Sequence, residues 1–255
     1  MAGLGIVGVG ELAEFVLRGL RRAGDDRPVS LSPRNAARAA RLAQDCGATL
    51  LASNQAVLDA ANLILVAVPP KDVYGTLEAL AWQNRHVVIC VAIDVTCAGL
   101  QEAAPHATIA RAMPSSCLAL NRGATPIFPA EPQTEALFAT IGDIAVLESE
   151  AQFETASALA AYYLWSFAVM DAVAERAITE GLPPVTARRL TAALTAGAAA
   201  IGAEQPEQPL RTTLDRYALP GTMTLQGLEK LRAEGGIAAW ETALDLAIMR
   251  MRQGA

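Results

Sequence analysis

The sequence predicts an α/β fold, in which a doubly wound parallel sheet is followed by an all-helical dimerisation region. Up to about residue 149, short apolar runs alternate with segments of helical periodicity, as in parallel sheets covered by helices on both faces. From Glu150 onward there is no strand pattern, and long apolar or alanine-rich segments follow one another. We therefore expect two domains, residues 1–149 and 150–255.

The first expected strand leads into a glycine-rich turn. An apolar strand at residues 4–7, the tripeptide Gly-Val-Gly and a segment of helical periodicity follow one another. Strand, G-x-G-x-x-A and helix in this order form the dinucleotide-binding fingerprint in its required setting. Gly8 permits the tight turn, Gly10 leaves room for the pyrophosphate, and the helix N-terminus attracts anions. The cofactor contacts expected here are Gly8, Gly10, Glu11 and Leu12.

The second expected strand, residues 27–32, ends in a Ser-Pro-Arg-Asn tetrapeptide. At this position an NAD site usually carries an acid for the ribose hydroxyls, whereas a 2′-phosphate needs donors and positive charge. The tetrapeptide has no acid but offers a hydroxyl, a guanidinium and an amide. We therefore expect NADPH as the cofactor, with Ser32 and Arg34 as contacts. A solvated turn before the next helix would explain the same residues.

The rest of the first domain repeats the alternation of strand and helix. Residues 63–68 are continuously apolar, as in a strand buried on both faces. Asn54 is expected to cap or precede the helix that follows it. The remaining expected strands are 48–51, 63–68, 86–93, 108–111, 124–128 and 145–147, and the expected helices are 34–46, 55–60, 72–80 and 133–141.

The C-terminal half predicts self-association. Residues 151–180 are apolar nearly all round, which a surface helix of a monomer cannot be. A helix at 185–203 is rich in small residues, which allow close helix packing. Further helices are expected just beyond residue 209, at 225–234 and at 237–251. We expect a homodimer with interlocked C-terminal helices, or a higher oligomer.

Composition excludes several other classes of function. The net charge of −6 argues against nucleic acid as a partner. The four cysteines show no ligand spacing with the two histidines, so we expect no metal site, a reducing cytoplasmic compartment and solvated His86 and His106. No signal peptide is expected before the first strand. The longest uncharged run, residues 155–170, is short for a bilayer, so no membrane segment is expected.

Several motifs occur in the order and spacing of a known family. The most specific are Arg-Ala-Met-Pro at residues 111–114 and Pro-Gly with a following threonine at 220–224. With these motifs the chain resembles the pyrroline-5-carboxylate reductase family over nearly its whole length. The resemblance implies a Rossmann domain, a helical dimerisation domain and NAD(P)H-dependent reduction of a small cyclic imine. It adds the expected cofactor contacts Asn54, Ala67, Val68, Pro69, Ala92, Met113 and Pro114.

Departures from the family motifs concern the substrate. The family's late Ser-Pro-Gly-Gly-Thr-Thr loop, which binds the substrate carboxylate, is Leu-Pro-Gly-Thr-Met-Thr at residues 219–224. A polar, glycine-rich run in the long helix is replaced by the bulky residues 159–165, and Ala-Ala-Gly after the fifth strand is Ala-Ile-Asp. Because a carboxylate needs several convergent donors, we expect a larger or carboxylate-masked pyrroline. The expected substrate contacts are Tyr163, Trp165, Leu219, Thr222 and Met223.

Imine reduction asks mainly that the C=N bond be placed against the nicotinamide, with one hydrogen-bonding group near the nitrogen. Thr224 matches the family threonine for that role and can also be the N-cap of the helix at 225. Tyr162 can donate a proton or pack in an interface core. Asp94 can favour a substrate cation or simply end a strand. Arg111 is expected to be structural.

Three alternatives differ in function. A conventional pyrroline-5-carboxylate reductase that makes proline and a non-catalytic NADP(H)-binding homologue both fit the motifs. A β-hydroxyacid dehydrogenase would carry a catalytic lysine in the first long helix of the second half. No lysine lies between residues 72 and 229, which disfavours that class.

Overall fold

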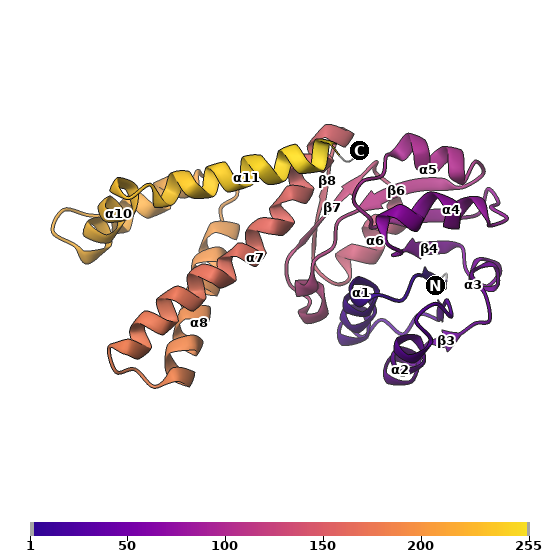
Figure 1. Cartoon of the computed structure of the whole chain (residues 1–255), viewed down its shortest axis with the longest axis horizontal. Coiled ribbons are helices and arrows are strands. Elements are labelled where there is room, and N and C mark those ends of the chain that lie inside the picture. The colour runs from indigo at the N-terminus through magenta and orange to yellow at the C-terminus, as the bar shows by residue number, and fades with distance from the viewer. Residues whose placement is uncertain (1–2, 254–255) are drawn as a thin grey trace. The chain divides into compact units, whose positions relative to one another are not determined.

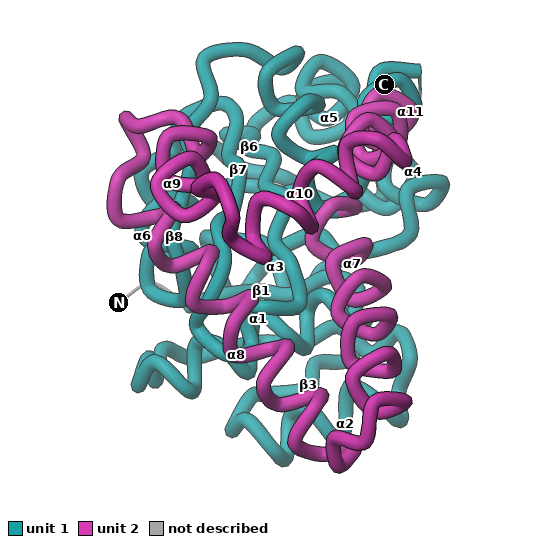
Figure 2. The backbone as a smooth tube through the Cα atoms, turned by 90° about the vertical axis from the view of Figure 1, so that its left-hand side faces the viewer, with its two compact units in different colours: residues 1–160, 248–255 teal, residues 161–247 magenta. Residues whose placement is uncertain are grey.

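The computed structural model describes residues 3–253, which form two compact units. Unit 1 comprises the described residues up to Ala160 and from Ile248 onward, and unit 2 comprises Ala161–Ala247 (Figure 2). Residues 1–2 and 254–255, at the outer ends of the two expected domains, lie outside the described residues.

Unit 1 is built on an eight-stranded sheet in the order β3-β2-β1-β4-β5-β6-β7-β8. Neighbouring strands are parallel except for β6 and β7, which are antiparallel. The order reverses beside β1, which lies between β2 and β4, and such a switch point opens a crevice at the carboxyl ends of the strands. The predicted doubly wound sheet is confirmed. The strands are β1 Leu4–Val7, β2 Val29–Leu31, β3 Thr49–Leu50, β4 Leu63–Val66, β5 Val87–Cys90, β6 Thr108–Ala112, β7 Ala124–Phe128 and β8 Asp143–Val146.

Helices cover both faces of this sheet (Figure 1). Alternate residues of a strand point to opposite faces, so Leu4 and Ile6 of β1 belong to one core cluster and Val7 to the other. The helical elements are α1 Glu11–Arg22, α2 Ala36–Cys46, α3 Asn54–Ala60, η1 Pro70–Asp72, α4 Val73–Glu78, α5 Cys97–Ala103, η2 Ser116–Leu120, α6 Pro132–Ala139 and the start of α7 Glu150–Thr179.

Several local expectations differ from the structure. Helix α5 and the short helix η2 were not expected, because segments of five to seven residues carry too little periodicity. Ser53, and not Asn54, caps α3: the Ser53 hydroxyl accepts the Ala56 N–H at 3.1 Å. The strand expected over 86–93 ends at Cys90, and the following residues form a loop.

His86 is buried, with 1% of its surface exposed, so the expectation of a solvated side chain is wrong. Its Nδ1 accepts the N–H of Gln83 at 3.0 Å, and its ring packs edge-on against Trp82. The loop before β5 therefore folds back over the histidine. His106 is exposed.

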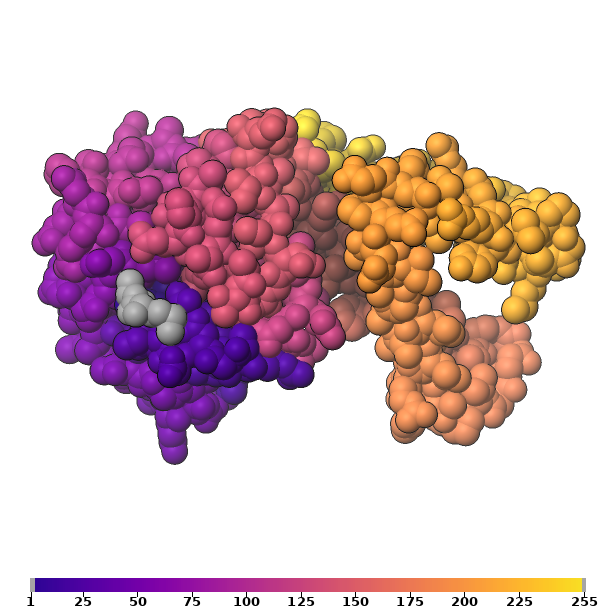
Figure 3. Space-filling view, turned by 180° about the vertical axis from the view of Figure 1, so that it is seen from behind, coloured from indigo at the N-terminus to yellow at the C-terminus, as the bar shows by residue number. Residues whose placement is uncertain are grey.

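Unit 2 consists of the rest of α7 with α8 Pro184–Ala203, α9 Leu210–Tyr217, α10 Met223–Ala233 and most of α11 Gly236–Gln253. The α7–α8 turn and α10 lie apart from each other within this unit (Figure 3). Helix α7 has 30 residues and is long and apolar enough to cross a membrane. The uncharged run at residues 155–170 is shorter than this helix, and from that run we expected no membrane segment. Only 11% of its most apolar window is buried, so this helix presents an apolar surface.

Candidate active site

A cavity of about 350 Å³ lies at the switch point of the sheet. It is formed by the β1–α1 turn, the turn after β2 and the end of β4. Open α/β sheets bind ligands at this place. Its lining residues are Gly8, Val9, Gly10, Glu11, Leu12, Arg34, Asn35, Ala67, Val68 and Pro69.

The two glycines of the turn have different reasons to lack a side chain. Gly8 has φ +93°, and a Cβ there would lie 2.7 Å from backbone atoms of Ala67 and Val68. Gly8 is therefore required by the packing of the turn against β4. A Cβ on Gly10 would meet only the Ala67 carbonyl oxygen, at 3.9 Å, and no side chain caps α1 at this residue. The protein leaves open space beside Gly10 and the first N–H groups of α1.

Three polar residues follow β2 at the edge of this cavity. The Ser32 side chain is fully buried, and its hydroxyl oxygen accepts the N–H of Gly8 at 3.0 Å, so Ser32 braces the turn. Arg34 lines the cavity and donates from Nη2 to Asp72 Oδ2 at 2.8 Å. Asn35 also lines the cavity, in a left-handed conformation with φ +60°.

A second cavity, of about 260 Å³, adjoins the first and shares Leu12, Ala67 and Val68 with it. It is predominantly apolar and extends the surface toward the end of β5. Its other lining residues are Pro70, Val91, Ala92 and Ile93.

Asp94 follows this second cavity directly and is ion-paired. Its carboxylate accepts two hydrogen bonds from Arg250, at 2.9 and 2.7 Å. These hydrogen bonds and the charge of Asp94 raise the pKa of Arg250. Asp94 has φ +61°, a conformation that favours glycine, and it stands where the family motif has glycine. A substrate cation at Asp94 would therefore compete with a guanidinium that is already bound.

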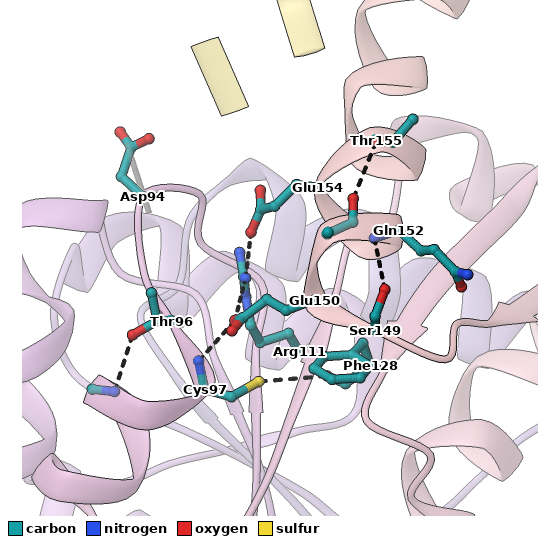
Figure 4. A network of polar contacts seen from close by, with 12 residues as sticks. Asp94, Thr96, Cys97, Arg111, Phe128, Ser149, Glu150, Gln152, Glu154 and Thr155 are labelled. Carbon is teal, nitrogen blue, oxygen red and sulfur yellow. Dashed lines mark hydrogen bonds and ion pairs between the residues drawn. The ribbon is translucent and has the colours of Figure 1, made fainter. Parts of the chain in front are cut away.

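Arg111 is fully buried at the end of β6, where it connects the sheet to α7 (Figure 4). Its Nη1 donates to Glu150 Oε1 at 2.8 Å and to Glu154 Oε1 at 2.5 Å. The guanidinium lies 4.5 Å from the centre of the Phe153 ring. Burial alone would lower the pKa of Arg111, but hydrogen bonds and charges of the two glutamates outweigh burial and raise it. Arg111 therefore fastens the first turns of α7 to the sheet.

Cys97 lies beside this network, and its N–H donates to Glu150 Oε1 at 2.8 Å. Burial and the nearby Glu150 charge raise the pKa of the Cys97 thiol to about 12. The thiol is therefore protonated at neutral pH and is a poor nucleophile. Among residues 3–253, no group of three or more His, Cys, Asp or Glu side chains could hold a metal ion.

The aromatic residues of α7 pack within unit 2. The rings of Tyr162 and Trp165 lie 5.7 and 6.3 Å from the ring of Trp240 on α11, both in edge-on geometry. Tyr163 is half-buried. An apolar cavity of about 290 Å³ lies beside this cluster. It is lined by Trp165, Ala168, Val169, Ala239, Trp240 and Ala243.

In the loop at residues 219–224 of unit 2, the first threonine, Thr222, forms hydrogen bonds with nearby backbone groups. The Thr222 hydroxyl accepts the N–H of Leu225 at 3.2 Å and donates to the Leu219 carbonyl at 2.7 Å, so Thr222 caps α10. Thr224 is the second residue of this helix and is exposed, so the expectation that it is the N-cap is wrong. Leu219 and Met223 are 53% and 88% exposed.

The structure thus gathers many of the expected cofactor contacts and leaves others apart. The first cavity holds Gly8, Gly10, Glu11, Leu12, Arg34, Ala67, Val68 and Pro69, and the second holds Ala92. Asn54 begins α3, and Met113 and Pro114 follow β6; these three are not among the residues that line either cavity. The sequence analysis did not identify three residues that contact expected site residues: Asp72, Arg250 and Trp240. Asp72 lies 38 residues from Arg34, and Arg250 lies 156 residues from Asp94. Trp240 lies at least 75 residues from Tyr162 and Trp165, so no local pattern shows these contacts.

Comparisons with known proteins match both ends of the chain. Residues 3–93 match the family described as NADP oxidoreductase, coenzyme F420-dependent, and residues 150–254 match the pyrroline-5-carboxylate reductase dimerisation family. The pyrroline-5-carboxylate reductase of Thermus thermophilus is 29% identical over 260 residues, which cover 97% of this chain and 96% of the relative.

Solved structures show the same fold. A pyrroline-5-carboxylate reductase from Coxiella burnetii aligns with a TM-score of 0.86 at 24% identity, covering 100% of this chain and 98% of its own. Plasmodium falciparum pyrroline carboxylate reductase, solved with NADP bound, aligns with a TM-score of 0.86 at 15% identity, with coverage of 99% and 98%.

Proposed function

We propose that this chain is a member of the pyrroline-5-carboxylate reductase family and that it uses NADPH to reduce the C=N bond of a cyclic, pyrroline-type imine. We further propose that its substrate is a larger or carboxylate-masked pyrroline in a specialised pathway. The enzyme is thus an oxidoreductase that acts on C=N, as its relatives are.

The first cavity fits a dinucleotide phosphate. Gly10 leaves open the space that a Cβ would fill, and the N-terminus of α1 at Glu11 and Leu12 directs N–H groups toward it. Arg34 supplies positive charge for a 2′-phosphate at the far edge. The backbone of residues 67–69 and the side of Ala92 would form the wall toward the nicotinamide. When bound, NADPH supplies the hydride.

The protein's part in the reaction is to position the imine and to exclude water. Thr224 would hydrogen-bond near the imine nitrogen, and Tyr162 would donate the proton that makes the C=N bond electrophilic. The apolar second cavity would exclude water from the hydride path. Asp94 would act on a substrate cation only by sharing it with Arg250.

One observation carries the substrate proposal: Thr222, the first of the two threonines in the late loop, uses its hydroxyl within the protein. Thr222 both donates and accepts within the loop, and its neighbours Leu219 and Met223 present apolar surface. A carboxylate placed there would lose its hydration without gaining the donors that offset the loss. An apolar or esterified substituent fits this surface better.

Assembly follows from the exposed apolar helices. The match of residues 150–254 to a dimerisation family and the exposure of α7 support a homo-oligomer. We propose a homodimer with interlocked C-terminal helices, from which a higher oligomer can be built, and a cytoplasmic location. No nucleic-acid or membrane partner is proposed, because the exposed face of α7 is assigned to the second copy.

The test is NADPH oxidation by the purified protein with pyrroline-5-carboxylate, 1-pyrroline and 1-pyrrolines that carry an ester or apolar substituent. We expect higher kcat/KM with the substituted, carboxylate-free imines. Leu219→Ser, which restores a hydroxyl, should shift the preference toward pyrroline-5-carboxylate, and Thr224→Val should lower kcat for every imine. Preference of the unmodified enzyme for pyrroline-5-carboxylate would refute the substrate proposal and identify a conventional reductase. NADPH binding without turnover of any imine would identify a non-catalytic homologue.

A further inference from the structure

Arg34, the residue that supplies positive charge to the nucleotide cavity, forms an ion pair with an acidic residue, Asp72. Its Nη2 donates to Asp72 Oδ2 at 2.8 Å. Asp72 ends η1, two residues after Pro70, and Pro69 and Pro70 line the first and the second cavity. The Asp72 side chain is 28% exposed and the Arg34 side chain is 56% exposed. The ion pair thus stands at the rim of the cavity and is accessible to a ligand.

A second pair repeats this arrangement on the same rim. Arg38, in the first turn of α2, lies 3.5 Å from Glu11 Oε1 and 3.9 Å from Glu14 Oε2, and Glu11 also lines the cavity. Arg34, which lines the cavity, and Arg38, whose partner Glu11 lines it, are therefore each paired with an acid on a neighbouring element. An anion that binds Arg34 must share its guanidinium with Asp72.

Asp72 has two opposite effects on such an anion. Its hydrogen bond holds the Arg34 side chain at the cavity, which reduces the side-chain entropy lost on binding. Its carboxylate occupies N–H donors of the Arg34 guanidinium, so it competes with a phosphate for them. Asparagine at this position would keep an oxygen acceptor for Arg34 and remove the charge. Asp72→Asn therefore separates the two effects.

Resting on the use of NADPH proposed above, we propose that Asp72 sets the preference between NADPH and NADH by limiting the affinity of Arg34 for the 2′-phosphate. Asp72 is a positioning residue in this role, because it acts through Arg34. NADH lacks the 2′-phosphate, so its affinity does not depend on the Asp72 charge. The ratio of the two dissociation constants isolates the effect.

The experiment is calorimetric titration of the full-length protein with NADPH and with NADH, for the unmodified chain and Asp72→Asn. We expect the Kd for NADPH to fall about three- to tenfold and the Kd for NADH to stay within about twofold. The effect should shrink at about 1 M salt, where charges are screened. Glu78→Gln, an exposed acid on α4, is the matched control and should change neither constant.

A double variant tests the route through Arg34. In Arg34→Gln, the added Asp72→Asn should no longer change the Kd for NADPH. An unchanged or lower NADPH preference in Asp72→Asn, with NADH still bound normally, would overturn the inference and leave the proposed function intact. If the unmodified protein binds neither dinucleotide, the proposed function and the inference both fail.

Discussion

The two units of the molecule place their apolar side chains differently. In unit 1, strand residues such as Ile6, Ile64 and Leu65 are completely buried between the sheet and its helices. In unit 2, Phe167 of α7 and Leu194 of α8 are 60% and 73% exposed. A sheet covered on both faces completes its own core, whereas a few helices around a long apolar one do not. Unit 1 completes its own core, whereas unit 2 leaves apolar side chains exposed, which the proposed homo-oligomer would cover.

Ion pairs show the same contrast. Arg111 in unit 1 is fully buried between two glutamates. Arg176 and Glu180 in unit 2 also form an ion pair, but their side chains are 69% and 64% exposed. A buried charge without its partner is costly, whereas an exposed pair is largely compensated by water. The buried ion pairs of Arg111 therefore stabilise unit 1, and the exposed Arg176–Glu180 pair of unit 2 contributes little.

The largest expected effect is on the stability of unit 1. Arg111→Ala would leave Glu154 buried without its cation, and we expect the free energy of unfolding to fall by about 3–5 kcal/mol. Arg176→Ala should leave it essentially unchanged. Urea denaturation followed by circular dichroism measures both. Equal losses in the two variants would contradict the contrast between the units.

The next effect concerns the cavity that unit 1 keeps open. Gly10→Val would fill space that the protein itself does not use, so we expect the Kd for NADPH to rise at least about 100-fold, with little change in unfolding. Gly75→Ala, in α4, adds a methyl group that meets nothing within 4 Å and is the control. Calorimetric titration measures the affinity. Normal NADPH binding by Gly10→Val would place the cofactor elsewhere.

A smaller effect is expected on self-association through unit 2. Leu194→Glu places a charge on the exposed apolar surface of α8, and we expect about 30-fold weaker association. Leu120→Glu makes the same change at a leucine of unit 1 that is 59% exposed, and it should leave association unchanged. Sedimentation equilibrium measures both constants. If Leu194→Glu associates normally, α8 is not part of the interface.

The smallest expected effect is a pH dependence in unit 1. Burial lowers the pKa of His86 below 6.5, and the Arg85 charge acts in the same direction. The unfolded chain therefore takes up this proton first, so stability is fully present above pH 6.5 and falls as the pH drops below that value. His86→Gln should make the free energy of unfolding depend less steeply on pH between about 7 and 5. An unchanged slope would exclude His86 as its source.

The sequence by itself determined the fold class, the glycine turn and the identity of most cavity residues. These features depend on residues close together in the chain: a strand needs a few consecutive apolar residues, and the turn between β1 and α1 needs Gly8 at its positive φ. Because parallel strands end at one edge of the sheet, the motifs after β1, β2 and β4 meet wherever this topology forms.

Only the tertiary structure decided which charges pair and which side chains are covered. Arg34 pairs with Asp72, which is 38 residues away in the sequence. Asp94 pairs with Arg250 across 156 residues, and Arg111 pairs with Glu154 across 43. No local pattern encodes such contacts, because they depend on where two elements pack and on which rotamer brings the side chains within hydrogen-bonding distance. For the same reason the choice of Thr222 over Thr224 as a cap was settled by the exact residue at which the loop ends and α10 begins.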